Sequence, residues 1–108
     1  MRFTIGCLGA VLLLSLACSA AQKKGDPAKG KTVFAETCAP CHNADSDARK
    51  MGPSLKGLFK KTKLEDGKKV TEENVRWQIN TGGKQMPHYQ DILTDQEKDD
   101  LIAYLKTL

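Results

Sequence analysis

Polar and apolar residues follow a helical period in three stretches of this chain, whereas the alternation typical of β-strands is nearly absent. The last of these stretches has apolar residues at the spacing i, i+3, i+4 and i+7, namely Leu101, Tyr104, Leu105 and Leu108. It begins with the capping-box pair of Thr94 and Glu97. This pattern predicts a helix that runs to near the end of the sequence.

Two earlier stretches carry the start and stop signals of helices. In the first, Asp26 can act as the N-cap, and a helix of about eleven residues would lead into Cys38. In the second, Thr71 is the expected N-cap, and the glycines at positions 82 and 83 end the helix. Turn signals separate the two stretches at Gly52-Pro53, Gly57 and Asp66-Gly67. The expected fold is all-α, with three or more helices joined by long loops.

The first 21 residues differ from the rest of the chain. One basic residue, Arg2, precedes an apolar run from Phe3 to Ala17, and small residues follow as far as Ala21, which is the layout of a secretory signal. We therefore expect a signal peptide at 1–21, a short tether at 22–25 and a single domain at 26–108. This organisation predicts export, either to the periplasm or to the outer face of the cytoplasmic membrane.

Two alternatives for the leader remain open. The uncharged run from Phe3 to Ala21 is barely long enough for an uncleaved membrane anchor. In addition, the segment LSLAC, which ends at Cys18, resembles the loose lipobox of bacterial lipoproteins, although Ser15 stands where leucine is usual. In that case the signal ends at residue 17, and a lipid on Cys18 anchors the chain.

Without the leader, the domain has too few residues to be stabilised easily by an apolar core alone. Domains of this size usually depend on disulfides, a metal or a cofactor. The two cysteines outside the leader, Cys38 and Cys41, are so close in sequence that a disulfide between them would close only a tiny loop. A bound cofactor is the better source of stability.

The segment TCAPCHNAD at 37–45 holds the pattern C-x-x-C-H, formed by Cys38, Cys41 and His42. A thioredoxin-type redox pair would follow a strand and open a helix, but here a predicted helix precedes the cysteines. A structural zinc site needs four ligands, and only His88 could complete this set, without the usual second cluster. The pattern C-x-x-C-H is the specific sequence signal for attachment of c-type haem, and this is the preferred interpretation in an exported chain.

In haem attachment, two thiols add to the two vinyl groups on one edge of the porphyrin, so the residue after the second cysteine lies under the iron. His42 is therefore the expected proximal ligand. A ligating imidazole needs an acceptor that fixes its ring. The segment Gly52 to Leu55 follows closely enough to supply a backbone carbonyl, which we assign to Pro53, although an ordinary turn explains Gly52-Pro53 equally well.

The sixth iron ligand decides what such a haem does, because Met/His ligation saturates the iron and an open site admits small ligands. Met51 follows His42 too closely in sequence to reach the opposite face easily, so we expect it to pack against its neighbours. Met86 lies in a later loop that contains glycines and is free to fold over the distal face. His88 would give bis-His ligation of lower potential, but we expect it to be an exposed loop residue.

Nearly all of residues 26–108 resemble a class I cytochrome c. The resemblance is carried by four segments: CAPCH at 38–42, GPSLKGL at 52–58, Met86-Pro87 followed by Tyr89, and LIAYLKTL at 101–108. It implies a small cytochrome c-like fold whose loops wrap around one covalent haem and whose first and last helices cross. The crossing would place Gly30 and Phe34 against Tyr104 and Leu105.

The resemblance also implies the roles of individual residues. Cys38 and Cys41 would hold the haem c, one per chain, and His42 and Met86 would ligate its iron. By the same resemblance, Pro53 accepts a hydrogen bond from His42. Trp77 would donate its indole N–H to a haem propionate, unless it is simply a partly buried helix aromatic. The segment 60–74 matches the family only loosely, so its haem contacts are not implied.

The implied function is that of a monohaem electron carrier, not an enzyme. It would shuttle between a quinol-oxidising complex and an oxidase, reductase or dehydrogenase, with membrane attachment through the N-terminus as an option. Two alternatives are a tethered haem subunit of a larger redox enzyme, and a ligand-binding or weakly peroxidatic haem protein whose sixth ligand is labile. The sequence alone does not separate the shuttle from the subunit.

Charge adds a prediction about partners. The chain has a formal net charge of +4 and few aromatic residues, which gives no support for nucleic-acid binding. One group of lysines would form either a solvated face or a rim that steers an acidic redox partner: Lys56, Lys60, Lys61, Lys63, Lys68, Lys69 and Lys84. One group of acids would form a solvated face favoured by the dipole of the last helix: Asp91, Asp95, Glu97, Asp99 and Asp100.

Overall fold

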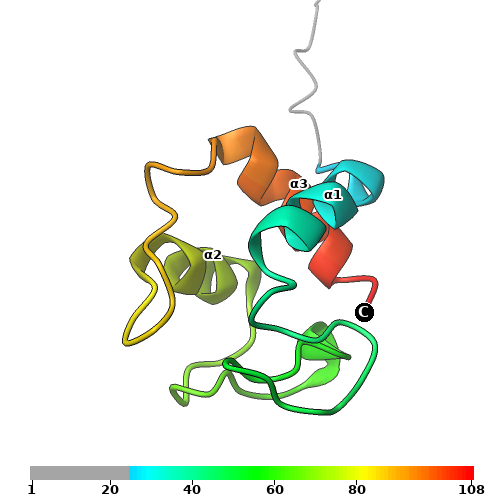
Figure 1. Ribbon diagram of the computed structural model, residues 1–108, viewed down its shortest axis with the longest axis vertical. Helices are drawn as coiled ribbons and strands as arrows, with labels where there is room; N and C mark the ends of the chain where they lie inside the picture. The colour runs from blue at the N-terminus through cyan, green and yellow to red at the C-terminus, as the bar shows by residue number, and fades with distance from the viewer. Residues whose placement is uncertain (1–24) are drawn as a thin grey trace, which may run out of the picture.

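A computed structural model of the chain describes residues 25–108. These residues form three α-helices and one turn of 3₁₀-helix in the order α1 (Pro27–Thr37), η1 (Leu58–Lys60), α2 (Glu72–Thr81) and α3 (Asp95–Leu105). Helices α1 and α3 cross, α2 lies beside them, and the long connection from α1 to α2 loops below all three in the view of Figure 1. The all-α fold with long loops is therefore confirmed. The predicted leader at 1–21 lies outside the described residues.

The three predicted N-caps each make the expected hydrogen bond. The side chain of Asp26 accepts from the backbone N–H of Ala28. The Thr71 hydroxyl accepts from Asn74, and Thr94 and Glu97 form a complete capping box. Each cap satisfies backbone donors that the first turn of a helix leaves without a partner. Local sequence signals therefore set where all three helices begin.

The α1–α3 crossing is close because Gly30 has no side chain. A Cβ atom at this position would lie 1.9 Å from the carbonyl oxygen of Asp100 and 2.8 Å from Cβ of Tyr104. One turn later, the rings of Phe34 and Tyr104 pack with their centroids 5.4 Å apart. The predicted contact of Gly30 and Phe34 with Tyr104 is confirmed. The buried apolar residues of the domain form one cluster: Phe34, Leu58, Val75, Ile79, Leu93, Leu101, Ile102 and Leu105.

Asp100 departs from the solvated acidic face that the sequence suggested for the start of the last helix. It is only 4% exposed. Its Oδ1 accepts hydrogen bonds from the backbone N–H of Asp26 at 2.8 Å and from Nε2 of Gln96 at 2.9 Å. The prediction was wrong for this residue because its carboxylate serves the start of α1, a contact between distant parts of the chain.

Strand structure is limited to two isolated bridges within residues 25–108, one between Lys63 and Lys69 and one between Gly83 and Met86. Gly57 and Gly67 have φ values of 64° and 88°, as expected where the sequence predicted turns. Over the same residues, the longest helix spans 11 residues, and none is long and apolar enough to cross a membrane.

Candidate functional site

The helices and the connecting loops enclose a cavity of about 940 Å³. Apolar side chains of the core, among them Leu58, Val75 and Leu101, form part of its wall. Its volume lies in the range of roughly 300–1,000 Å³ that is typical of cofactor and ligand sites. All six residues that the sequence singled out line this cavity: Cys38, Cys41, His42, Pro53, Trp77 and Met86. The fold thus brings together residues from four separate segments.

The paired cysteines lie in the turn that directly follows α1. The backbone N–H groups of Cys41 and His42 both donate to the carbonyl oxygen of Cys38, at 3.0 and 2.9 Å. Both cysteines are free thiols. Burial, followed by the charge of Cys41, raises the pKa of the Cys38 thiol to about 11. A thioredoxin-type pair needs a lowered thiol pKa at the start of a helix, so both the position and the pKa argue against that chemistry.

His42 is held in a fixed orientation by the segment that the sequence suggested. Its Nδ1 lies 2.7 Å from the carbonyl oxygen of Pro53. Since a carbonyl can only accept, Nδ1 carries the proton and Nε2 is left with a free lone pair, the form in which histidine binds a metal. A Cβ atom at Gly52 would lie 2.4 Å from Cε1 of this ring. The imidazole therefore occupies space that only a glycine leaves open.

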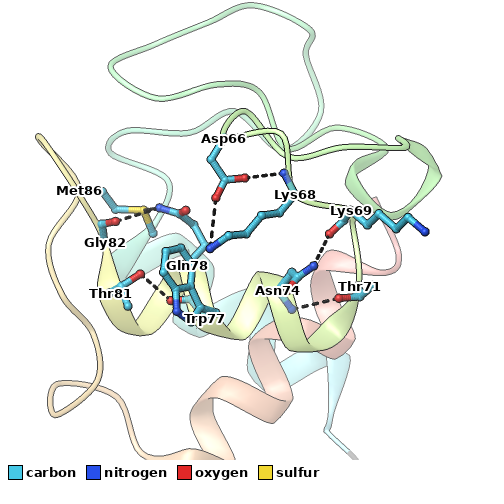
Figure 2. Close-up of polar contacts among 10 residues, drawn as sticks. All are labelled: Asp66, Lys68, Lys69, Thr71, Asn74, Trp77, Gln78, Thr81, Gly82 and Met86. Atoms are coloured by element: carbon cyan, nitrogen blue, oxygen red, sulfur yellow. Dashed lines mark hydrogen bonds and ion pairs between the residues drawn. The ribbon is translucent and has the colours of Figure 1, made fainter.

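Met86 lies in a tight turn after α2. Gly82 and Gly83 have φ values of 59° and 141°, conformations that favour glycine. Reciprocal backbone hydrogen bonds of 3.0 and 2.7 Å join Gly83 and Met86. From α2, the Gln78 side chain reaches toward this turn, with Nε2 at 3.6 Å from Sδ of Met86 and at 3.1 Å from the Gly82 carbonyl oxygen (Figure 2). The position of the thioether sulfur is thus set by both backbone and side-chain contacts.

The two other candidates for a sixth ligand are placed differently. Met51 also lines the cavity, on the side that carries the cysteines, with its sulfur 3.9 Å from Sγ of Cys41. It is 60% exposed, so the expectation that it packs against its neighbours was wrong. His88 is exposed as expected, and its Nδ1 contacts the carbonyl oxygen of Thr81. No group of three or more His, Cys, Asp or Glu side chains able to hold a metal ion occurs in the described part of the chain.

Trp77 is half exposed and contacts the loosely matching segment before α2. The amine of Lys68 lies 2.9 Å from the centroid of its indole ring (Figure 2). Lys68 also lies 3.9 Å from the Asp66 carboxylate, and the Asn74 amide donates to the carbonyl oxygen of Lys69 at 2.9 Å. These contacts hold the loop at 61–70 against α2, where several of its residues line the cavity. Gln78 was not predicted as a site residue, and Lys68 was predicted only as one of the surface lysines, because neither belongs to a recognisable motif.

The chemistry of this donor set fits a covalently attached haem. Two thiols lie one turn apart beside an imidazole with a free Nε2, and a thioether sulfur lines the same cavity. A thioether and an imidazole are the axial pair of cytochromes, and an apolar wall excludes water from a porphyrin. The residues present are therefore those that a c-type haem requires.

Comparisons with known proteins agree with this fit. Residues 25–105 match the family described as cytochrome C oxidase, cbb3-type, subunit III. The chain is 32% identical to cytochrome c2 of Rhodopila globiformis, over 78% of this chain and 94% of that protein. It is 31% identical to cytochrome c6 of Thermosynechococcus vestitus, over 96% of this chain and 88% of that protein.

A solved structure has the same fold. Cytochrome c6 from the diatom Phaeodactylum tricornutum superposes with a TM-score of 0.62 at 25% sequence identity. The match covers 77% of this chain and 93% of that one. The arrangement of three helices around the cavity is thus cytochrome c6-like.

Proposed function

Because this chain belongs to the family of small monohaem c-type cytochromes, we propose that it passes single electrons between redox proteins through one haem c with His/Met ligation. As its similarity to cytochromes c2 and c6 implies, the chain is an electron carrier rather than an enzyme. One observation carries the finer proposal: the C-x-x-C-H residues, a histidine with a fixed tautomer and a fixed methionine sulfur all line one cavity.

Each residue has a distinct part in this proposal. Cys38 and Cys41 provide the two covalent attachments, and His42 and Met86 provide the axial ligands. The Pro53 carbonyl keeps the His42 ring in one orientation, and Gln78 and the Gly82-Gly83 turn do the same for the Met86 sulfur. Trp77 is assigned to a haem propionate through its indole N–H. When bound, the haem supplies the one-electron change between ferric and ferrous iron.

Fixed ligands suit a carrier because the protein then rearranges little when the charge at the site changes. Ligand positions that are set by packing and hydrogen bonds are pre-organised, so the protein needs little reorganisation when the electron is transferred. The exposed lysines of the loop at 60–69 and Lys84 are assigned to partner docking, since Lys61, Lys63 and Lys84 lie at the cavity. Docking of an acidic partner at such a rim would weaken with salt.

The first test is the absorption spectrum of the ferrous haem-loaded protein before and after carbon monoxide. An unchanged spectrum is expected, because a methionine ligand closes the sixth position. In the variant Met86→Ala, carbon monoxide should bind and shift the spectrum. A rapid shift in the unaltered protein would instead favour a ligand-binding haem protein with a labile sixth site.

A second candidate function is that of a fixed haem subunit in a larger redox enzyme. It is favoured by the matching family, whose description names a subunit of an oxidase. Both functions use the same haem site, so the distinction lies in the partners. Affinity purification from membranes in mild detergent separates them: a permanent partner in stoichiometric amount indicates a subunit, and its absence at all salt concentrations indicates a shuttle.

Export belongs to the proposal as well. It rests on the sequence of residues 1–21, with Cys18 either lipidated or removed with the leader. The intact mass of protein extracted from membranes distinguishes the two forms. A diacylglycerol group on Cys18 adds mass to a chain that begins at this residue, whereas simple cleavage leaves an unmodified chain.

A further inference from the structure

Lys98 is a lysine almost without contact to water. It is the fourth residue of α3 and is 3% exposed, less than most of the apolar core. Its amine donates a hydrogen bond of 2.9 Å to the carbonyl oxygen of Gln90. The nearest acidic group is the Asp95 carboxylate at 3.9 Å, whose side chain is 96% exposed. The buried amine therefore has one good partner and one distant partner that water screens.

Packing alone does not explain a lysine at this position. Removing an ammonium group from water is costly unless hydrogen bonds and opposite charges replace the lost solvent. The first turn of a helix adds a small unfavourable term for a positive charge, because the helix dipole is positive there. An apolar side chain of similar length would fill the same space without either cost. What Lys98 adds is its bond to Gln90.

Gln90 belongs to the segment at 87–93, which directly follows Met86 and connects it to α3. Besides the contact of His88 with the Thr81 carbonyl oxygen and the burial of Leu93 in the core, the segment is held by Tyr89. Its backbone N–H donates to the Ile79 carbonyl oxygen at 3.0 Å, and its hydroxyl donates to the Thr37 carbonyl oxygen at 3.3 Å, at the end of α1. The Lys98 bond adds a fixed point from α3.

We propose that Lys98 is a positioning residue for Met86: its buried amine ties the carbonyl of Gln90 to α3 and thereby holds the methionine segment in the arrangement that presents the sulfur. This inference rests on the proposed role of Met86 as an iron ligand. It goes beyond that role because it assigns control of the ligand to a residue outside the cavity. Without the hydrogen bond from Lys98 to Gln90, the methionine segment would leave its position more often. The sixth coordination position of the iron would then open more readily.

The test measures how strongly imidazole binds to the ferric haem-loaded protein, since imidazole must displace the sixth ligand. Lys98→Met keeps the apolar bulk but removes the donor, and imidazole affinity is expected to rise about tenfold, as for the loss of a charge-assisted hydrogen bond. Lys98→Arg keeps a charged donor and should remain close to the unaltered protein. Lys31→Met, an exposed change in α1, is the matched control and should also leave affinity unchanged.

Thermal unfolding of the same proteins separates positioning from general stability. If Lys98 positions Met86, the rise in imidazole affinity occurs without a matching fall in the unfolding temperature. Equal imidazole affinities in Lys98→Met and the unaltered protein would overturn the proposal, as would a rise that simply follows a fall in stability. Should Lys98→Met not yield folded protein, Lys98→Gln, which is neutral and too short to reach Gln90, replaces it.

The variant Met86→Ala separates a failure of the proposed ligand role of Met86 from a failure of the proposed positioning role of Lys98. When Met86 is the ligand, Met86→Ala binds imidazole much more tightly than any Lys98 variant. If Met86→Ala leaves the imidazole affinity unchanged, Met86 is not the ligand, and the proposed role of Lys98 is overturned as well. If Met86→Ala has its full effect and Lys98→Met has none, only the role of Lys98 is overturned.

Discussion

The α1–α3 crossing and the cavity side of the domain are stabilised in different ways. At the crossing, Gly30 lies directly against the backbone of Asp100, and the Phe34 and Tyr104 rings pack on each other. Around the cavity of about 940 Å³, side chains of α2 and α3 form one part of the wall, and loops held by short-range turns and single hydrogen bonds form the rest. The first region is a close-packed protein core, whereas the second surrounds a cavity.

This difference indicates where substitutions should act. Protein interiors are close-packed, so an added atom at the crossing has to separate two helices. Loops around a cavity can adjust locally, so changes there should alter the proposed haem ligands more than the free energy of unfolding. The following predictions test this division, beginning with the largest expected effect.

The variant Gly30→Ala should separate α1 from α3. Its Cβ would lie 1.9 Å from a backbone carbonyl oxygen that cannot move without α3. We expect the free energy of unfolding to fall by about 3 kcal/mol, even though alanine favours a helix over glycine by about 1 kcal/mol. Chemical denaturation of the haem-loaded protein measures the change. Lys31→Ala, an exposed change in the same helix, is the control, and a Gly30→Ala protein as stable as this control would show that the crossing is not close-packed.

The variant Gly52→Ala should act on His42, the proposed haem ligand, rather than on the whole fold. The new methyl group would lie 2.4 Å from Cε1 of His42, so the ring has to turn away from the Pro53 carbonyl. The lost hydrogen bond should cost about 1 kcal/mol of stability, and the absorption spectrum and reduction potential of the haem should change as the imidazole is reoriented. Asp45→Ala, an exposed change in the same loop, should leave both properties unaltered. An unchanged potential in Gly52→Ala would mean that the ring orientation does not depend on this glycine.

The smallest effect is expected for Lys68→Ala. This variant removes the amine that lies over Trp77, a contact worth about 0.5–1 kcal/mol at an exposed site. The loop at 61–70 should then become more mobile, and hydrogen exchange of its backbone amides should accelerate. Lys69→Ala removes a neighbouring exposed lysine whose backbone carbonyl, not its side chain, contacts Asn74. Equal exchange rates in the two variants would show that the cation–π contact does not hold the loop.

Local signals explain what the sequence predicted well. The starts of all three helices follow from the caps at Asp26, Thr71 and Thr94, each of which acts within a few residues of itself. The C-x-x-C-H motif is equally local, since its spacing alone specifies the chemistry. The cytochrome c-like fold, including the helix crossing at Gly30, was predicted from the resemblance of four segments to class I cytochromes c.

The features that the sequence did not predict depend on contacts between distant segments. Asp100 was grouped with its acidic neighbours, because nothing in its surroundings shows that its partner is the backbone of Asp26. The burial of Lys98 could not be predicted from the sequence either, because a lysine among acidic residues near a helix start suggests a solvated surface. The contacts of Gln78 with Met86 and of Lys68 with Trp77 likewise arise only when the loops are in place. Hydrophobic periodicity carries no information about such pairings.

The raised pKa of Cys38 has a consequence for the order of assembly. With a pKa of about 11, roughly one thiol in ten thousand is ionised at neutral pH. Thiolates are the reactive form of cysteine, and this thiol is also packed against the apolar cluster. A chain that had already folded would therefore offer a poorly reactive sulfur for bond formation. Maturation should join cofactor and polypeptide while this segment is still open, so that the final fold closes over a bond that already exists.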